Sequence, residues 1–298
     1  MKLLMIADDF TGALDAGVQF AKKGFSTKVL VYSKDMSFQA EDADAETRHK
    51  KPLEAYLTIF RIVKPAAESG VKYLFKKTDS ALRGNIGAEL TAMLDATGKS
   101  LLSFVPAFPQ INRVTVNGVH YIEGIPVDRS VFGSDPFEPV TEANVEKLIH
   151  QQCETNVQTI SAGHTPDACQ EKTIAVYDCA SDEELKGIAD SLKKTDSLGL
   201  IAGCAGLAEI LPDVLGWPKS ETTQPRLPEK FLVVCGSVNP ITVRQLNYAE
   251  KHGFIRIQLT PEQKLNMEYF SEEDGKKWLD WFWDICSKNS KVIIDTND

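Results

Sequence analysis

Short apolar runs alternate with helix-length amphipathic segments along most of the chain, and this alternation restricts its fold more than any other feature. The pattern predicts an α/β fold, in which helices are layered on a sheet. Segment 11–23 shows the helical pattern, because its apolar residues recur at helical spacing and Gly24 follows its last turn. Further helices are predicted at 52–69 and 86–96. Strands are predicted at 3–7, 27–32, 72–75, 101–105, 173–177 and 198–202.

The segment 106–139 departs from this alternation, because it is rich in Pro, Gly, Asn and β-branched residues. Asn117-Gly118 and Glu123-Gly124 are turn signals between short apolar runs, which predicts a β-hairpin insertion. A long insertion in an α/β scaffold often shapes a binding site. A surface hairpin without a function is the alternative.

The segment 216–230 carries three prolines in a polar run and is the best candidate for a domain boundary. We predict a first domain over 1–222, which would bind the substrate, and the N-terminal part of a second α/β domain over 223–298. In the second domain we expect strands at 231–235, 255–259 and 292–295. Helices are expected there at 241–251 and around 278–286.

Acidic residues outnumber basic ones, with 42 Asp and Glu against 33 Lys and Arg, and the formal net charge is −9. A chain with this charge is not expected to bind nucleic acid or an anionic membrane, although a few local cations suffice for a small anion. No apolar run approaches the roughly 18 residues of a membrane span, and the N-terminal run is too short for a signal peptide. The six cysteines and five histidines match no metal-ligand spacing. We therefore expect a cytoplasmic protein with free thiols and no set of metal ligands.

Two adjacent carboxylates, Asp8 and Asp9, separate the first predicted strand from the first predicted helix. Ligands of open α/β sheets bind at the carboxyl ends of the strands. Carboxylates in this position can accept a proton from a hydroxyl, hold Mg²⁺ or bind a polyol. A solvated turn with Asp9 or Thr11 as a simple helix cap is the alternative.

A second polar loop connects a predicted strand to a predicted helix. Arg83 offers a planar guanidinium suited to a carboxylate or phosphate, and Lys77 and Asp79 add one charge of each sign. The polar segment 46–49 can contribute Arg48 to the same edge of the sheet. The alternative for the second polar loop is a surface loop with internal salt bridges. The alternative for segment 46–49 is ordinary surface.

Glycine-rich turns give a weaker signal. Ser237 and Asn239 lie between a predicted strand and a helix start, where backbone N–H groups can hold a phosphate. The stretch 203–207 has the same character, and we expect it to serve packing. Gly98-Lys99-Ser100 resembles the end of a P-loop, but it follows a helix and Met93 replaces the first glycine.

Six blocks, in order, resemble the four-carbon acid sugar kinase family: ADDFTGALDAGVQFAKKG at the N-terminus, ETRH at 46–49, KKTDSALRGN at 76–85, VPAFPQINRVTVNG at 105–118, GIPVDRSVFGSDP at 124–136 and CGSVNP at 235–240. The resemblance covers essentially the whole chain. It implies an N-terminal lobe that binds a sugar acid and a C-terminal lobe that binds ATP. It also implies transfer of the γ-phosphoryl group to a hydroxyl of threonate, erythronate or 3-oxo-tetronate.

The resemblance also implies roles for individual residues. Asp8 and Asp9 would face the sugar acid, one of them as the base. The hydroxyls and carboxylate of the substrate would be bound by Lys77, Asp79, Ser80 and Arg83. Ser237 and Asn239 would lie near the nucleotide phosphates. We expect ATP and Mg²⁺ as cofactors, and the predicted hairpin edge can pair with a second subunit.

The sequence departs from the family in two places. The glycine-rich nucleotide loop has no counterpart up to Asp298, so we expect the chain to lack the end of the C-terminal lobe. Segment 36–48 is polar where the family places an apolar strand, which predicts a degenerate strand or a deletion. Two alternatives stay open: a non-catalytic protein that binds an acid sugar, and a dehalogenase-type phosphohydrolase. The phosphohydrolase needs carboxylates two positions apart, and Phe10 stands where the second carboxylate would follow Asp8.

Overall fold

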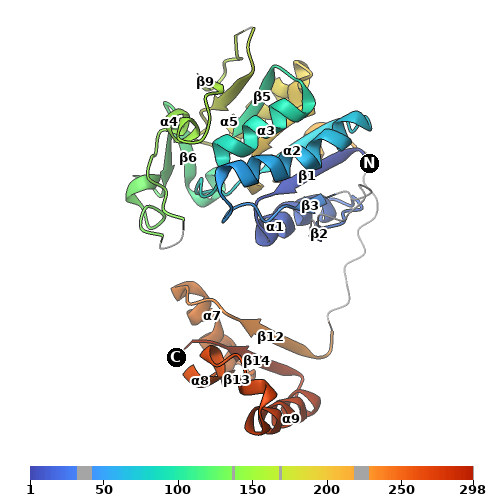
Figure 1. Cartoon of the computed structure of the whole chain (residues 1–298), viewed down its shortest axis with the longest axis vertical. Helices are drawn as coiled ribbons and strands as arrows, with labels where there is room; N and C mark the ends of the chain where they lie inside the picture. The colour runs from blue at the N-terminus through green and yellow to red at the C-terminus, as the bar shows by residue number, and fades with distance from the viewer. Residues whose placement is uncertain (32–41, 136–137, 168–169, 218–227, 298) are drawn as a thin grey trace. The chain divides into compact units, whose positions relative to one another are not determined.

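A computed structural model describes residues 1–31, 42–135, 138–167, 170–217 and 228–297. The chain divides into two compact units, residues 1–222 and 223–298. The predicted boundary between 222 and 223 lies outside the described residues. Each unit contains a parallel sheet with helices (Figure 1), so the predicted α/β class is confirmed.

The first unit is built on an eight-stranded sheet of parallel strands in the order β2-β3-β1-β4-β11-β5-β10-β9. The strands are β1 (Leu3–Ala7), β2 (Leu30–Val31), β3 (Asp42–Asp44), β4 (Tyr73–Lys77), β5 (Leu101–Val105), β9 (Asn156–Ile160), β10 (Thr173–Tyr177) and β11 (Leu200–Gly203). Neighbouring strands need crossover connections because they are parallel, and the helices supply them.

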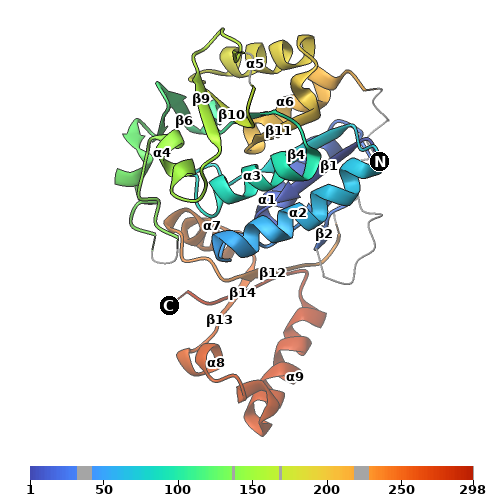
Figure 2. The ribbon, with the colours of Figure 1, turned by 45° about the horizontal axis from the view of Figure 1, so that its top comes forward.

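Helices cover both faces of this sheet (Figure 2). One face packs against α2 (Pro52–Glu68), α3 (Ile86–Thr97) and α4 (Val145–His150). The other packs against α1 (Phe10–Ala21), α5 (Asp182–Lys194) and α6 (Ala205–Leu215). Side chains alternate along a strand, so Leu4 and Ile6 of β1 enter the first core and Met5 enters the second. Both faces of the central strands are buried, which explains why β1 and β11 are continuous apolar runs.

The structure differs from the predicted elements mainly at the edges of the sheet. The polar segment 36–48 contains, in its described part, the three-residue strand β3, which pairs with β1 through its backbone. Strand β9 was not predicted, because it is an edge strand with mixed polarity. Helix α4 was also not predicted, because it has only six residues.

The predicted insertion forms a three-stranded antiparallel sheet of β6 (Arg113–Val116), β7 (Val119–Ile122) and β8 (Ile125–Pro126). The turn residues Asn117 and Gly118 have φ values of 52° and 73°. Positive φ at both positions is the geometry of the two-residue hairpin turn that Asn-Gly favours. Four 3₁₀ turns complete the described chain: Pro109–Ile111, Val127–Arg129, Ser197–Gly199 and Tyr269–Ser271.

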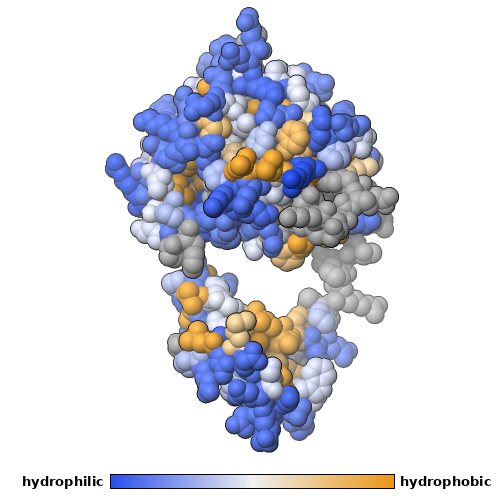
Figure 3. Space-filling view, in the orientation of Figure 1, coloured by the Kyte–Doolittle hydropathy of each residue, from blue (hydrophilic) through white to orange (hydrophobic). Residues whose placement is uncertain are grey.

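The second unit has a parallel sheet in the order β12-β14-β13. Its strands are β12 (Phe231–Cys235), β13 (Ile255–Gln258) and β14 (Lys291–Asp295), and its helices are α7 (Pro240–Lys251), α8 (Pro261–Leu265) and α9 (Glu273–Lys288). Apolar side chains are exposed on this unit (Figure 3), among them Leu232 and Val234 of β12.

The carboxyl ends of the central strands of the first unit form one row. Ala7 pairs with Lys77, Lys77 with Gly203, and Gly203 with Val105. Ala7 also pairs with Asp44 on its other side. Strand β1 thus lies between two strands that follow it in the chain, which makes the β1–β4 boundary a topological switch point. The loops that follow β1, β3, β4 and β5 therefore leave from the same edge.

Candidate functional site

Asp8 and Asp9 directly follow β1 and differ in their contacts and exposure. Asp8 is 2% exposed, and its Oδ2 accepts a hydrogen bond of 2.8 Å from Arg48 Nε. Asp9 is the N-cap of α1, and its Oδ1 accepts a hydrogen bond of 2.8 Å from Gly12 N. The predicted cap and the predicted charged site are therefore the same residue. The sequence could not decide between them because one carboxylate can serve both.

Arg48 joins three of the predicted site residues. Its Nη1 lies 2.9 Å from Asp9 Oδ2, and its Nη2 lies 3.6 Å from Asp79 Oδ1. Burial opposes the charge on Arg48, but the three carboxylates, Asp8 foremost, raise the pKa of its guanidinium above the ordinary value. The Asn85 side chain orders the segment, because its Nδ2 donates to the carbonyl oxygens of Thr47 at 2.9 Å and Lys50 at 2.8 Å.

The loop after β4 is organised by Asp79. Its Oδ2 accepts hydrogen bonds from the backbone N–H groups of Ala81 and Arg83, at 3.1 and 3.2 Å. The Arg83 guanidinium donates to both oxygens of Asp79 and, at 3.1 Å, to Asp135 Oδ2. Burial favours the neutral form of Asp79, but Arg83 and Arg48 outweigh it and lower the pKa of this carboxyl to about 2. Arg83 therefore forms the internal salt bridges that the sequence left as an alternative.

Lys77 is 4% exposed and lies at the carboxyl end of β4. Its Nζ donates to Thr78 O at 3.0 Å, and no carboxylate of the described chain lies within ion-pair distance of it. A Cβ added to Gly12 would lie 2.7 Å from Lys77 Nζ and 2.5 Å from Asp9 Oδ1. The bare Cα of Gly12 thus allows Lys77 and Asp9 to approach the first turn of α1 together.

Ser80 contacts Arg113, a residue that the sequence did not single out. The Nη1 of Arg113 donates to Ser80 Oγ, and its guanidinium lies over the Phe132 ring. Burial lowers the pKa of Arg113, and no carboxylate forms an ion pair with it in the described chain. Arg113 begins β6, so the predicted insertion does contribute to this edge of the sheet. The hairpin signal located the insertion but could not show which of its side chains faces the β4 loop.

His120 connects the insertion to the same loop. Its Nε2 lies 3.0 Å from Ser80 O, and its Nδ1 lies 3.0 Å from Thr115 Oγ1. Because a carbonyl oxygen only accepts, Nε2 carries the proton and the Thr115 hydroxyl donates to Nδ1. Burial lowers the pKa of His120 to about 4. His120 is therefore neutral at pH 7, and its two hydrogen bonds connect β6 to the loop after β4.

A buried ion pair lies on the α3 side of the sheet, where Lys76 Nζ is 3.0 Å from Glu89 Oε2. Burial raises the pKa of Glu89, while Lys76 opposes the rise. Five further buried side-chain oxygens, among them Asp8 Oδ1, Thr47 Oγ1 and Thr78 Oγ1, have no hydrogen-bond partner in the described part of the chain. Unpaired buried oxygens of this kind usually bind internal water.

Ser237 and Asn239 belong to the second unit, at the start of α7. Asn239 Oδ1 accepts from Ile241 N at 2.9 Å, and Ser237 Oγ accepts from Asn239 N at 3.2 Å. Among the described residues, no protein acceptor is recorded for the backbone N–H groups of Gly236, Ser237 and Val238. A Cβ at Gly236 would meet nothing within 4 Å. The turn is therefore an open run of N–H donors, which suits an anion.

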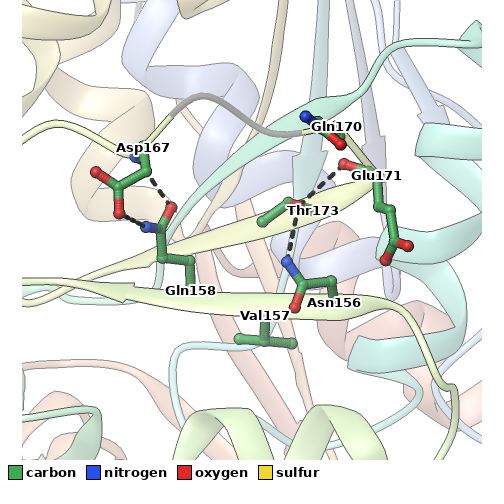
Figure 4. Close-up of a pocket in the computed structure, with 7 residues that line it drawn as sticks. All are labelled: Asn156, Val157, Gln158, Asp167, Gln170, Glu171 and Thr173. Atoms are coloured by element: carbon green, nitrogen blue, oxygen red, sulfur yellow. Dashed lines mark hydrogen bonds between the residues drawn. The ribbon is translucent and has the colours of Figure 1, made fainter.

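A surface hollow lies beside β9 and β10 (Figure 4) and is lined by Asn156, Val157, Gln158, Asp167, Gln170, Glu171 and Thr173. Gln158 donates to Asp167 Oδ2 at 2.8 Å, and Asp167 N donates back to Gln158 Oε1 at 3.2 Å. Asn156 donates to Thr173 Oγ1 at 2.9 Å. These side chains satisfy one another. Asn156 and Thr173 begin their strands, so this hollow lies away from the row of carboxyl ends.

No group of three His, Cys, Asp or Glu side chains that could hold a metal ion occurs in the part of the chain that the structure describes. The five described cysteines are free thiols, and Cys169 lies outside the described residues. No described helix is both long enough and apolar enough to cross a membrane.

Comparisons with known proteins identify a family for this chain. The family model described as the sugar-binding N-terminal domain matches residues 3–211. A D-threonate kinase of Salmonella typhimurium is 34% identical over 267 residues, which are 85% of this chain and 62% of the kinase. A D-erythronate kinase of Heliobacterium modesticaldum is 31% identical, and the match covers 83% of this chain and 60% of the kinase. A 3-oxo-tetronate kinase of Burkholderia multivorans is 27% identical, with 81% and 62% covered. These matches confirm the resemblance to four-carbon acid sugar kinases, and the chain spans about three fifths of the length of these relatives.

Solved structures share the fold. A Salmonella typhimurium protein has a TM-score of 0.79 at 19% identity. The match covers 99% of this chain and 74% of that protein. A Haemophilus influenzae protein has a TM-score of 0.72 at 21% identity, with 99% and 75% covered. A domain of unknown function from Bordetella bronchiseptica, crystallised with bound citrate as a domain-swapped dimer, has a TM-score of 0.62 at 24% identity, with 100% and 75% covered.

Proposed function

Because this chain belongs to the family of sugar-binding N-terminal domains, we propose that its first unit binds a four-carbon sugar acid for ATP-dependent phosphorylation of a hydroxyl. The substrate class is that of the kinases it resembles: threonate, erythronate or 3-oxo-tetronate. One observation carries the proposal. Three loops from separate strands bring Asp8, Asp9 and Asp79 around one guanidinium, that of Arg48.

This arrangement suits a polyhydroxy acid. Carboxylates held by arginine keep a fixed orientation and accept hydrogen bonds from substrate hydroxyls. Asp9 is the more accessible of the first pair, with a side chain 28% exposed against 2% for Asp8. We assign Asp9 as the base that takes the proton of the attacking hydroxyl and Asp8 as the residue that fixes Arg48. Ser80, Arg83 and Lys77 complete the substrate-binding set.

The nucleotide belongs to the second unit in this proposal. The open N–H donors around Ser237 and the start of α7 at Asn239 would bind its phosphates. The substrate hydroxyl oxygen attacks the γ-phosphorus, its proton passes to Asp9, and ADP leaves. Mg²⁺ would enter with the phosphates of the nucleotide, because this ion usually keeps substrate phosphates and waters among its ligands and takes only one or two carboxylates.

Two measurements test the proposal. Calorimetric titration with D-erythronate, D-threonate and L-threonate should give saturable binding of at least one isomer. With Mg²⁺ and ATP, the same isomer should be phosphorylated with release of ADP. Asp9→Asn should lower this turnover by about 100-fold or more, since general base catalysis contributes about 10²–10⁴-fold. Asp190→Asn on α5 is the matched control and should leave turnover unchanged.

The alternatives give different results. A binding protein without catalysis would bind the acid but show no affinity for ATP. A phosphohydrolase would release phosphate from a phosphate ester with Mg²⁺ and without ATP. Absence of binding for all three isomers would contradict the proposed sugar-acid site in this chain.

A further inference from the structure

One aromatic ring at the edge of the candidate site contacts two guanidinium groups. The centroid of the Phe132 ring lies 5.1 Å from Cζ of Arg83 and 5.1 Å from Cζ of Arg113. Arg83 belongs to the loop after β4 and Arg113 begins β6, so the ring connects two separate parts of the first unit. A cation within about 6 Å of a ring centroid is attracted by the electrons of the aromatic face. Phe132 therefore attracts both arginines.

The two arginines differ in their other partners. Arg83 pairs with two carboxylates, whereas Arg113 forms no ion pair in the described chain. Burial lowers the pKa of Arg113 most, and the like charge of Arg83 acts in the same direction. Repulsion between the two charges would by itself separate the guanidiniums. The recorded contacts of the Arg113 guanidinium are the Ser80 hydroxyl and the Phe132 ring, and the ring is also in contact with Arg83.

A tight turn fixes the position of the ring independently of the arginines. Ser130 Oγ donates to Val127 O at 2.7 Å and accepts from Phe132 N at 3.2 Å. Gly133 N donates to Ser130 O at 3.1 Å. A Cβ at Gly133 would overlap the carbonyl oxygen of Asp128, so the turn closes because this residue has no side chain. Phe132 also packs against the core on the α3 side of the sheet, which makes its ring a preorganised support.

The segment that carries Phe132 contacts Arg83 a second time. Asp135 Oδ2 accepts a hydrogen bond of 3.1 Å from Arg83 Nη1, and Asp79 accepts from Nε and Nη2 of the same guanidinium at 3.0 and 3.1 Å. A guanidinium is planar, so carboxylates bind along its edge while an aromatic ring binds its face. Three of its five N–H donors are used in these bonds, and the other two can meet a ligand. Edge and face contacts together leave Arg83 little freedom to turn.

We propose that Phe132 is a positioning residue of the candidate site, whose ring holds Arg83 and Arg113 in a fixed arrangement for the incoming sugar acid. This inference rests on the proposed function and deepens it. Because Arg113 donates to Ser80 Oγ, the ring also helps to place the Ser80 hydroxyl, a member of the proposed substrate-binding set. Without the ring, the like charges would separate, and the substrate would have to order both side chains at a cost in affinity.

A reagent for guanidinium groups tests the hold of the ring without any substrate. Phenylglyoxal modifies accessible arginines, and mass spectrometry gives the rate at each residue. In Phe132→Leu we expect Arg83 and Arg113 to react about fivefold faster than in the wild type, since the ring no longer covers them. Phe132→Tyr keeps the ring and should stay close to the wild type. Arg48, which is not in contact with Phe132 in the described chain, serves as the internal reference.

Calorimetry measures the consequence for binding. For a tetronate isomer that binds the wild type, Phe132→Leu should raise Kd about tenfold, and Phe132→Tyr should recover most of the affinity. Phe60→Leu is the matched control, because Phe60 is a partly buried ring that packs against the same core. Among the described residues, no cation is recorded over the Phe60 ring, so this variant should bind as the wild type does.

Urea unfolding confirms that each variant is folded, and Phe132→Met replaces Phe132→Leu if the latter does not fold. Unchanged modification rates or an unchanged Kd in Phe132→Leu would overturn the positioning role and leave the proposed function intact. Equal losses of affinity in Phe132→Tyr and Phe132→Leu would also overturn it, because the shape of the side chain and not its aromatic face would then be responsible. Faster modification in Phe132→Leu, with no tetronate bound by the wild type, would confirm the hold on the arginines but contradict the proposed function.

Discussion

Lys76 Nζ lies 3.0 Å from Glu89 Oε2, and the two side chains are 0% and 1% exposed, beneath the loops that carry the candidate site. Strand β4 sends Lys76 to the α3 face and Lys77 to the α1 face, because side chains alternate along a strand. One lysine thus pairs with a carboxylate inside the fold, while its neighbour forms no ion pair in the described chain and belongs to the proposed substrate-binding set. The two adjacent lysines therefore have different surroundings, although their side chains are chemically identical.

The buried pair predicts an asymmetric response to mutation. Glu89→Gln should destabilise the protein by about 3–5 kcal/mol, because it leaves a buried ammonium without its anion. The double variant Lys76→Met with Glu89→Leu removes both charges at similar volume and should recover most of the loss. Urea unfolding at pH 7 measures all three free energies of unfolding. A double variant that is less stable than Glu89→Gln would show that the pair stabilises the fold by more than mutual neutralisation.

Gly12→Ala should weaken binding of the sugar acid and, to a smaller extent, destabilise the fold. The added methyl group would overlap Asp9 Oδ1 and Lys77 Nζ, which are ends of side chains and can move away. Loss of the Asp9 cap should cost about 1 kcal/mol of stability. The displaced pair should lower the affinity for the sugar acid by more than tenfold. Gly187→Ala, at a helix position where the added Cβ meets nothing within 4 Å, is the matched control.

His120 predicts a pH dependence of stability between about 6.5 and 4. The folded-state pKa is about 4 and the ordinary value is 6.5, so the unfolded state takes up a proton first as the pH falls. Stability is full above about 6.5, decreases through this window by about 3 kcal/mol, and levels off below 4. His120→Asn should be less stable at pH 7 but should lose this slope. An NMR titration of the wild type in which the His120 ring protonates near pH 6.5 would refute the assignment.

The lowered pKa of Asp79 predicts a second pH range, more acidic than that of His120, in which the stability of the protein changes. Its pKa is lowered from 3.8 to about 2 in the folded protein, so its contribution is present above about pH 4 and lost as the pH falls toward 2. The contribution is about 2 kcal/mol, from about 1.4 kcal/mol for each pH unit. The difference in unfolding free energy between wild type and Asp79→Asn should shrink by this amount from pH 5 to pH 2. A constant difference over that range would mean that the effect of Asp79 comes from shape alone.

Much of the fold could be predicted from the sequence, because local patterns determine it. Strands 101–105 and 231–235 match their predicted bounds, and the Asn117-Gly118 turn lies where the insertion reverses. The elements that were missed carry weak local signals. Strand β3 has no apolar alternation and forms by pairing with β1, whose partner residues lie 37 positions earlier.

The sequence by itself placed Asp8, Asp9, Lys77 and Arg83 in loops after strands, and strand order brought those loops to one edge of the sheet. Only the tertiary structure decided which charges remain available. Arg83 is neutralised by Asp79 and Asp135, whereas Arg113, to which the sequence assigned no role, forms no ion pair in the described chain. Neutralisation depends on distances of a few ångströms between side chains from separate loops, and charge interactions fall off with such distances. A linear pattern records which charges exist, but the packing of strands and loops determines which of them cancel.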